Sequence, residues 1–228
     1  MNNFPDHILV NNHHYVAFNK PGGMAVQSVH QKEQSLEVLL FHYCKANLFL
    51  IHRIDQPCSG VVLFAKKKTS AAYFSELIKS QNIERRYLAL VSNKPLKDMD
   101  TLSHFLFAHK KSNKSFEVDE THKEGKKAIL EYVFCGTLPN GNHLLEIKLE
   151  TGRHHQIRAQ LAAIGSPIIG DIKYGSKESR SDNSIALHAY SLDFIHPVDQ
   201  TNVKIIAPVP DIEIWKNAQS ISEGLKLK

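Results

Sequence analysis

Runs of hydrophobic residues along this chain alternate with short polar breaks, a pattern that predicts many strands and few helices. Continuous or alternating apolar runs, typical of strands, lie at 15–18, 61–65, 84–91, 102–107, 128–134, 143–149, 185–194 and 203–207. Apolar residues at helical spacing lie at 35–44, from Thr69 or Ser70 to about Ser80, around 157–164, and at 211–220.

The order of these elements predicts an α+β fold. Strands outnumber helices and most connections are short enough for hairpins, so we expect a mixed, mainly antiparallel sheet flanked by helices. Asn140-Gly141 marks one hairpin, between the strands at 128–134 and 143–149. The lysine-rich region 93–127 is interpreted as solvated loop around a single strand. No repeat or linker divides the sequence, so one domain over residues 1–228 is predicted.

Composition narrows the class of protein. The formal net charge of +5 and the 14 histidines permit a polyanionic partner without establishing one. The three cysteines show no C-x-x-C spacing, so neither a disulfide framework nor a zinc knuckle is predicted, and a reducing compartment fits best. The N-terminus lacks the features of a secretory signal, and no run approaches the ~18 apolar residues needed to span a bilayer. A cytoplasmic protein without a membrane segment is predicted.

One irregular, charged stretch precedes the buried run at 61–65. In His52-Arg53-Ile54-Asp55 an arginine and a carboxylate lie two residues apart, and Pro57 and Gly60 prevent a regular element from forming. An aspartate beside an arginine stays ionised, so it can act as a nucleophile or an electrostatic stabiliser. A structural salt bridge that closes the turn is the simpler interpretation of this stretch taken alone.

A second group of polar residues lies at the start of the helix near 157–164. His154 and Arg158 are one helical turn apart and His155 lies three residues before Arg158, so several hydrogen-bonding groups point toward a common side. The histidines could also suggest a metal-dependent hydrolase. However, the chain has no H-E-x-x-H motif, and adjacent histidines point in different directions on a regular element, so no metal site is predicted.

Several motifs occur in a characteristic order. They are His52-Arg53-Ile54-Asp55 with Ser59-Gly60, then 86–91, then 151–158, then 165–171 with Tyr174-Gly175, and more weakly Asn19-Lys20-Pro21 and Leu187-His188-Ala189. Over about residues 14–208 this series resembles the RluA-type RNA pseudouridine synthases. The resemblance implies the pseudouridine synthase fold and isomerisation of uridine in RNA: the glycosidic C–N bond breaks and the base rejoins the ribose through carbon 5. It also implies that no metal or organic cofactor is needed.

The resemblance implies a role for individual residues. Asp55 matches the catalytic aspartate, and Arg158 matches the arginine that pairs with it and holds it ionised. Tyr87 matches the tyrosine that stacks on the target base, although a tyrosine in a strand is also an ordinary core residue. Arg53 matches the arginine that fills the space left by the flipped uridine. The further candidates for contacting the RNA are His52, Arg153, His155 and Lys66.

Departures from the family pattern lie near these residues: Ile54 replaces the usual leucine, Cys58 stands where threonine is common, His154 where threonine or serine is usual, and Ala159-Gln160 where Val-His is usual. They bear on substrate choice more than on the reaction. The chain lacks room for the small N-terminal RNA-binding domain of many relatives, so it resembles the shorter members that modify a stem-loop in transfer RNA or ribosomal RNA, and a monomer is expected. The alternatives are an RNA-binding module of the same fold without turnover and a metal-dependent hydrolase.

Overall fold

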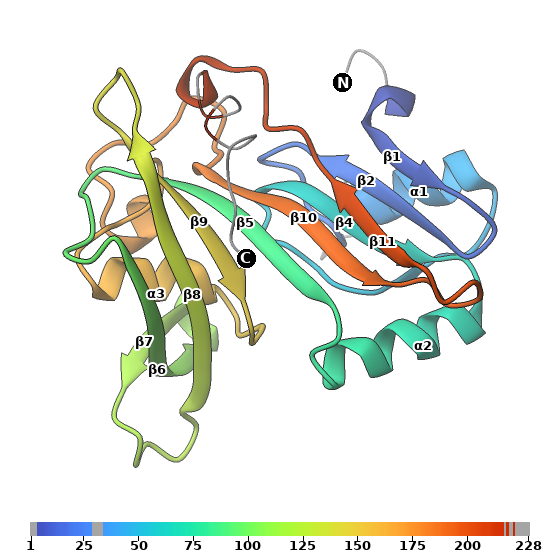
Figure 1. The fold of residues 1–228 in the computed structure, drawn as a ribbon, viewed down its shortest axis with the longest axis horizontal. Coiled ribbons are helices and arrows are strands. Elements are labelled where there is room, and N and C mark those ends of the chain that lie inside the picture. Colours follow the sequence, from blue (N-terminus) through green and yellow to red (C-terminus); the bar gives the residue numbers. More distant parts are fainter. Residues whose placement is uncertain (1–3, 29–33, 217, 219–220, 222–228) are drawn as a thin grey trace. The chain divides into compact units, whose positions relative to one another are not determined.

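The computed structural model describes residues 4–28, 34–216, 218 and 221. Within it the chain divides into two compact units (Figure 1). Unit 1 comprises residues 1–85 and 188–210, and unit 2 comprises residues 86–187 and 211–228. The prediction of a single domain over the whole chain stays a prediction.

Unit 1 is a mixed sheet with two helices. Its neighbouring strands follow the order β1 (Ile8–Asn11), β2 (Tyr15–Lys20), β4 (Ser59–Ala65), β10 (Leu187–Ile195), while β3 (Phe49–Leu50) pairs with β4 and β11 (Asn202–Ile206) pairs with β10. The β4–β10 pair is parallel and the others are antiparallel. The helices are α1 (Leu36–Cys44), α2 (Lys68–Lys79) and the short 3₁₀ helix η1 (Phe4–His7).

Strand β4 is the central strand of unit 1, and all seven of its residues are buried. Its second residue, Gly60, has φ +113°, and a Cβ atom built there would lie 2.2 Å from the carbonyl oxygen of Ala189 in β10. Only glycine permits both this backbone conformation and this close approach. The segment that contains Asp55 therefore leads into a strand that is fixed against its neighbour.

Unit 2 is an antiparallel sheet. Its strand order is β5 (Glu84–Val91), β9 (His143–Leu149), β8 (Lys126–Thr137), β6 (Met99–His109), β7 (Lys114–Val118). Helix α3 (Gln156–Ala163) packs on this sheet through a small core that contains Leu106, Ala128, Ala159 and Tyr174 (Figure 1). Three 3₁₀ turns complete the unit: η2 (Lys110–Ser112), η3 (Ile172–Tyr174) and η4 (Glu213–Trp215).

The structure confirms the predicted fold class, and it corrects several elements. Helix α2 begins at Lys68 and not at Thr69 or Ser70, because Ser70 is buried inside the first turn and Lys67 takes the N-cap position. Strand β7 lies in the region interpreted as loop. Of the predicted helix at 211–220, residues 213–215 form η4, and 217, 219 and 220 lie outside the described residues. Among the helices described, none is long and apolar enough to cross a membrane.

Candidate active site

Asp55 lies in a tight turn between β3 and β4 of unit 1. The backbone N–H of Cys58 donates to the carbonyl oxygen of Asp55 at 3.0 Å, which closes the turn. The side-chain amide of Gln56 donates to the carbonyl oxygen of Gly23 at 3.0 Å. Asp55 itself is partly exposed, so the turn presents a carboxylate at the surface of a rigid sheet.

Lys20, at the end of β2, holds this turn from within. Its side chain is fully buried, and Nζ donates to the carbonyl oxygens of Pro21 (2.9 Å), Met24 (2.8 Å), Gln56 (3.1 Å) and Cys58 (2.6 Å). An ammonium group has three N–H bonds, so four acceptors share them. Burial lowers the pKa of Lys20 to about 8, against the opposing influence of Cys58 and Asp55.

The other end of the turn is fixed by a buried histidine. Nδ1 of His188 lies 2.9 Å from Oγ of Ser59, and its Nε2 lies 3.0 Å from the carbonyl oxygen of Ala207. Because a carbonyl oxygen only accepts, Nε2 carries the proton and Nδ1 accepts from the Ser59 hydroxyl. Burial lowers the pKa of His188 to about 4, so the ring is neutral. In the sequence, Lys20 and His188 belong only to the weaker motifs, and no role was predicted for either residue.

The two predicted RNA-contacting residues next to Asp55 differ in their surroundings. Arg53 is exposed. Nε2 of His52 is buried and has no hydrogen-bond partner among the described residues. Burial, and then the charge of nearby Arg85, lower the pKa of His52 to about 3. His52 can therefore act toward RNA only as a neutral ring.

Lys66 lies at the opposite end of β4 from the Asp55 turn. Seven residues of β4 separate the two, and a strand advances about 3.3 Å per residue, so the separation is roughly 20 Å. The prediction that Lys66 contacts RNA stays open, and the contact would lie far from the target base.

In unit 2, Arg158 makes a buried pair with a carboxylate of its own unit. Nε and Nη2 of Arg158 donate to the two carboxylate oxygens of Asp171 at 2.7 and 2.8 Å, and the guanidinium lies 5.0 Å from the centre of the Tyr174 ring. This two-bond geometry fixes the orientation of the arginine. Asp171 was part of a quoted motif, but no role was predicted for it. Pairing of Arg158 with Asp55 stays a prediction.

Tyr174 also organises the histidines at the start of α3. Its hydroxyl oxygen accepts from the backbone N–H of Ser115 at 2.7 Å and lies 3.0 Å from Nδ1 of His155. His155 is buried, has φ +51°, and stacks on His154 at 3.8 Å between ring centres. These contacts show that His155 helps to hold the start of α3 in place. Contact between His155 and RNA stays a prediction.

Tyr87 and Arg153 complete the predicted set. Tyr87 lies in β5 opposite Ile147 and is 7% exposed. Arg153 is exposed, and its Nε donates to the carbonyl oxygen of Lys127 at 2.8 Å. Unit 2 thus carries Tyr87, Arg153, His155 and Arg158, whereas unit 1 carries His52, Arg53, Asp55 and Lys66.

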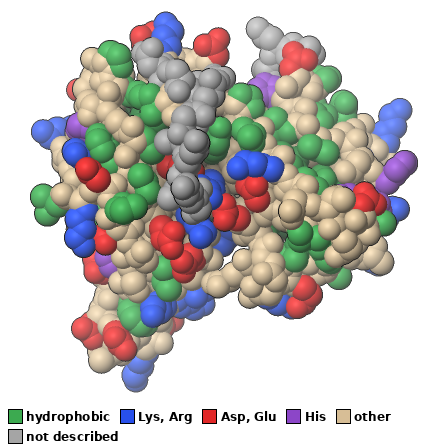
Figure 2. Space-filling view, viewed as in Figure 1, with side chains coloured by type: hydrophobic (Ala, Val, Ile, Leu, Met, Phe, Trp, Pro, Cys, Tyr) green, Lys and Arg blue, Asp and Glu red, His purple; other side chains and the backbone are tan. Residues whose placement is uncertain are grey.

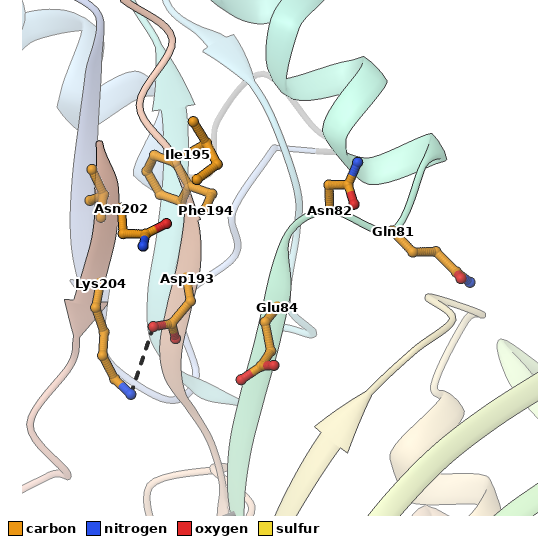
Figure 3. A pocket seen from close by; sticks show the side chains of 9 residues that line it. Gln81, Asn82, Glu84, Asp193, Phe194, Ile195, Asn202 and Lys204 are labelled. Carbon is orange, nitrogen blue, oxygen red and sulfur yellow. Dashed lines mark ion pairs between the residues drawn. The ribbon is translucent and has the colours of Figure 1, made fainter. Parts of the chain in front are cut away.

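A cavity of about 510 Å³ lies in unit 1 between the end of α2 and the strands β10 and β11 (Figure 3). Glu84 and Asp193 contribute carboxylates to its lining, and Asp193 pairs with Lys204 at 3.7 Å. None of the predicted site residues lines it, and two carboxylates make it unsuitable for a phosphate group.

Within the described part of the chain, no three or more histidine, cysteine, aspartate or glutamate side chains are grouped so that they could hold a metal ion. The structure therefore adds no support for the metal-dependent hydrolase.

Comparison with known proteins decides the family. The sequence profile of the family described as RNA pseudouridylate synthase matches residues 14–163. The chain belongs to this family. The enzyme is therefore an RNA pseudouridine synthase, an isomerase that converts uridine to pseudouridine and has RNA as its partner, as predicted.

Individual relatives agree with this assignment. The enzyme is 30% identical over 209 residues to ribosomal large subunit pseudouridine synthase C of Rickettsia prowazekii, covering 90% of this chain and 68% of that protein. It is 31% identical over 226 residues to ribosomal large subunit pseudouridine synthase D of Xylella fastidiosa, covering 91% and 67%. Human RNA pseudouridylate synthase domain containing 4 has the same fold, with a TM-score of 0.74 at 22% identity over 91% of this chain and 90% of that one.

Proposed function

We propose that this RNA pseudouridine synthase uses Asp55 as its catalytic carboxylate and acts on a stem-loop of ribosomal RNA. The observation that carries the first part is the Asp55 turn. Asp55 is partly exposed and follows a short strand. Lys20 holds the backbone of its turn on one side, and the Ser59–His188 hydrogen bond fixes the start of β4 on the other. The second part draws on the relatives, which are named for the large ribosomal subunit.

The reaction sets the requirement for Asp55. The bond between ribose C1′ and N1 of uracil breaks, the base turns, a bond forms between C1′ and C5, the C5 proton leaves, and N1 takes up a proton. Asp55 would attack the base, attack C1′, or remove a ribose proton, and each of these steps requires an ionised carboxylate. A fixed turn lets this group meet the reacting atom without reorganisation, which is where a preorganised site gains rate.

The other roles complete the proposal. Tyr87 stacks on the target base, Arg53 fills the space that the flipped uridine leaves, and Arg158 holds the catalytic aspartate ionised. Asp171 would orient Arg158 through its two hydrogen bonds. His52, Arg153 and His155 would support the RNA around the target. We further propose that the enzyme acts as a monomer in the cytoplasm without a metal or an organic cofactor.

Release of tritium from RNA labelled at C5 of uridine tests the proposal, because the C5 proton is lost only when the new carbon–carbon bond forms. We expect release from large-subunit ribosomal RNA, unaffected by a chelator. Release from transfer RNA alone would contradict the proposed substrate. Tight RNA binding with no release would identify an RNA-binding module and overturn the catalytic proposal.

A further inference from the structure

Among the described residues, six surface lysines are neutralised by a neighbouring carboxylate and twelve are not. Among the described residues six such pairs have N–O distances of 2.5 to 3.9 Å: Lys79–Glu76, Lys94–Asp98, Lys97–Asp100, Lys148–Glu131, Lys204–Asp193 and Lys216–Glu213. Four lysines at one end of unit 1, which we call the lysine cluster, have no carboxylate partner among the described residues: Lys45, Lys66, Lys67 and Lys68.

The fold brings these four lysines together from two segments of the chain. Lys66 follows β4, its backbone N–H donates to the carbonyl oxygen of His14 at 2.8 Å, and its Nζ donates to the side-chain oxygen of Asn11. Lys45 ends α1 directly after Cys44. Phe49, four residues after Lys45, pairs with Ala65, the residue before Lys66, so the two segments meet at the same end of the β3–β4 pair. The charge of Lys66 also opposes the rise that burial causes in the pKa of Cys44.

Lys67 and Lys68 begin α2 and add to the positive potential. Lys67 is the N-cap and makes no side-chain capping bond, and the first turn of α2 contains no acidic residue. The first turn of α2 therefore supplies no anion of its own to offset the partial positive charge of the helix N-terminus. Lys45, Lys67 and Lys68 are exposed. Figure 2 shows Lys or Arg and His side chains along an edge of unit 1, with an Asp or Glu side chain beside them.

The lysines, and not the nearby histidine, supply this charge at neutral pH. Burial, and next the charge of Lys67, lower the pKa of His14, so its ring is neutral there. Asp199 is the one carboxylate whose influence on His14 opposes this shift. Four unpaired ammonium groups that repel one another gain most from a partner with regularly spaced negative charges, which is the chemistry of a nucleic acid backbone.

We propose that the lysine cluster binds RNA phosphates roughly 20 Å from Asp55, outside the target loop. This inference rests on the proposed function of Asp55, since the distance is measured from the turn where the uridine would react. Phosphates on one strand are spaced at about 3.4 Å along a duplex, so about six base-pair steps separate the reacting nucleotide from the cluster. A short RNA cannot occupy both places.

The test compares two stem-loops with the same loop and with stems of about 4 and about 12 base pairs. Binding of each to the full chain and to the Lys67→Gln/Lys68→Gln variant is measured across a salt series. For the long stem we expect the variant to bind about 5- to 20-fold more weakly near 0.1 M salt, with a salt slope smaller by about 1 to 2. For the short stem we expect equal affinities. Lys79→Gln serves as the matched control, because Lys79 lies at the other end of α2 and pairs with Glu76. This substitution should leave the affinity for both stems unchanged.

Three results would overturn the inference. The double variant could bind the long stem as tightly as the wild type, it could lose the same affinity for both stems, or Lys79→Gln could weaken binding as much as the double variant does. Dependence of phosphatidylserine vesicle binding on Lys67 and Lys68, with RNA binding unchanged, would assign the cluster to a membrane surface instead. Failure of the wild-type protein to release tritium would refute the proposed function alone, because the binding comparison still decides whether the cluster holds RNA.

Discussion

At the scale of single residues, Lys20 places one positive charge, out of contact with water, against the carbonyl groups that follow Asp55. Its neighbours are backbone oxygens from residues 21–24 and 56–58, so the charge joins two loops. A buried ammonium group is costly unless its hydrogen bonds are satisfied, and here all of them are. Lys20 is a positioning residue, because it acts through the turn.

Replacing Lys20 by Met keeps the length of the side chain but removes its donors, and we expect the free energy of unfolding at pH 7 to fall by roughly 2–4 kcal/mol. Catalysis should slow more than RNA binding weakens, since the turn is no longer held. Urea unfolding and tritium release at saturating RNA measure the two effects. Lys79→Met, at an exposed position, is the control, and a Lys20→Met protein as stable and as fast as the wild type would contradict this role.

The lowered pKa of Lys20 also predicts how stability depends on pH. The group titrates near pH 8 in the folded protein and near 10.5 when unfolded, so between these values the unfolded chain binds more protons. Stability from this group therefore rises as pH increases from about 8 to 10.5, by roughly 3 kcal/mol, and is lost again as pH falls through 8. The gap in unfolding free energy between wild type and Lys20→Met should widen over this range. A constant gap would contradict the prediction.

Asp171 gives a third prediction at this scale. Asp171→Ala removes the carboxylate that makes two hydrogen bonds to the buried guanidinium of Arg158, which should destabilise the protein by about 3–5 kcal/mol. Glu76→Ala breaks an exposed pair with Lys79 and should change stability little. Thermal or urea unfolding of both variants checks this prediction. Equal losses of stability would show that burial does not determine how much the Arg158–Asp171 pair contributes to stability.

At the scale of elements, the contact between β4 and β10 determines where the Asp55 turn ends. Gly60→Ala would place Cβ against backbone atoms of Ala189, which cannot move aside as a side chain could, so we expect a loss of more than about 4 kcal/mol or failure to fold. Gly141→Ala is the matched control: φ is +83° there, but nothing lies within 4 Å, and only backbone strain of about 1 kcal/mol is expected. Similar losses in urea unfolding would show that the close approach is unimportant.

The elements also show what a sequence can and cannot predict. Strands β5 and β9 lie at their predicted bounds, because alternation and the Asn140-Gly141 turn are local signals. Strand β7 is short and lies at the edge of its sheet, and Phe116 and Val118 are its only apolar residues, so the alternation there is too brief to predict a strand. The predicted start of α2 was wrong because Thr69 and Ser70 are typical capping residues, whereas the N-cap is Lys67 and Ser70 is buried inside the first turn.

The same limit applies to the candidate site. The charged stretch around Asp55 and the motif around Arg158 were visible as residue types at short spacing. Lys20 binds carbonyl groups up to 38 residues away, and Asp171 meets Arg158 across 13 residues, so these partners depend on the fold and on no local pattern. The candidate reacting residues were predictable from the sequence, whereas Lys20 and Asp171, which hold them in position, were not.

At the scale of the whole molecule, positive charge is distributed unevenly. Among the described residues, six surface lysines are paired with carboxylates, whereas the lysine cluster and eight other lysines are not. The net charge of +5 is consistent with an RNA partner. Membership of the RNA pseudouridylate synthase family sets the reaction, and the match from residue 14 to residue 163 includes Asp55, Tyr87 and Arg158. The central claim is that Asp55 is the carboxylate that performs this reaction.

Single-turnover conversion of uridine by wild-type protein and by Asp55→Asn tests this claim most directly. The amide has nearly the same size and shape as the carboxylate but cannot act as a nucleophile or a base at neutral pH, so the substitution removes the chemistry and keeps the turn. We predict at least about a 10³-fold slower release of tritium, with RNA affinity and unfolding free energy close to those of the wild type. Pseudouridine formation by Asp55→Asn at a rate within a few-fold of the wild type would contradict the account.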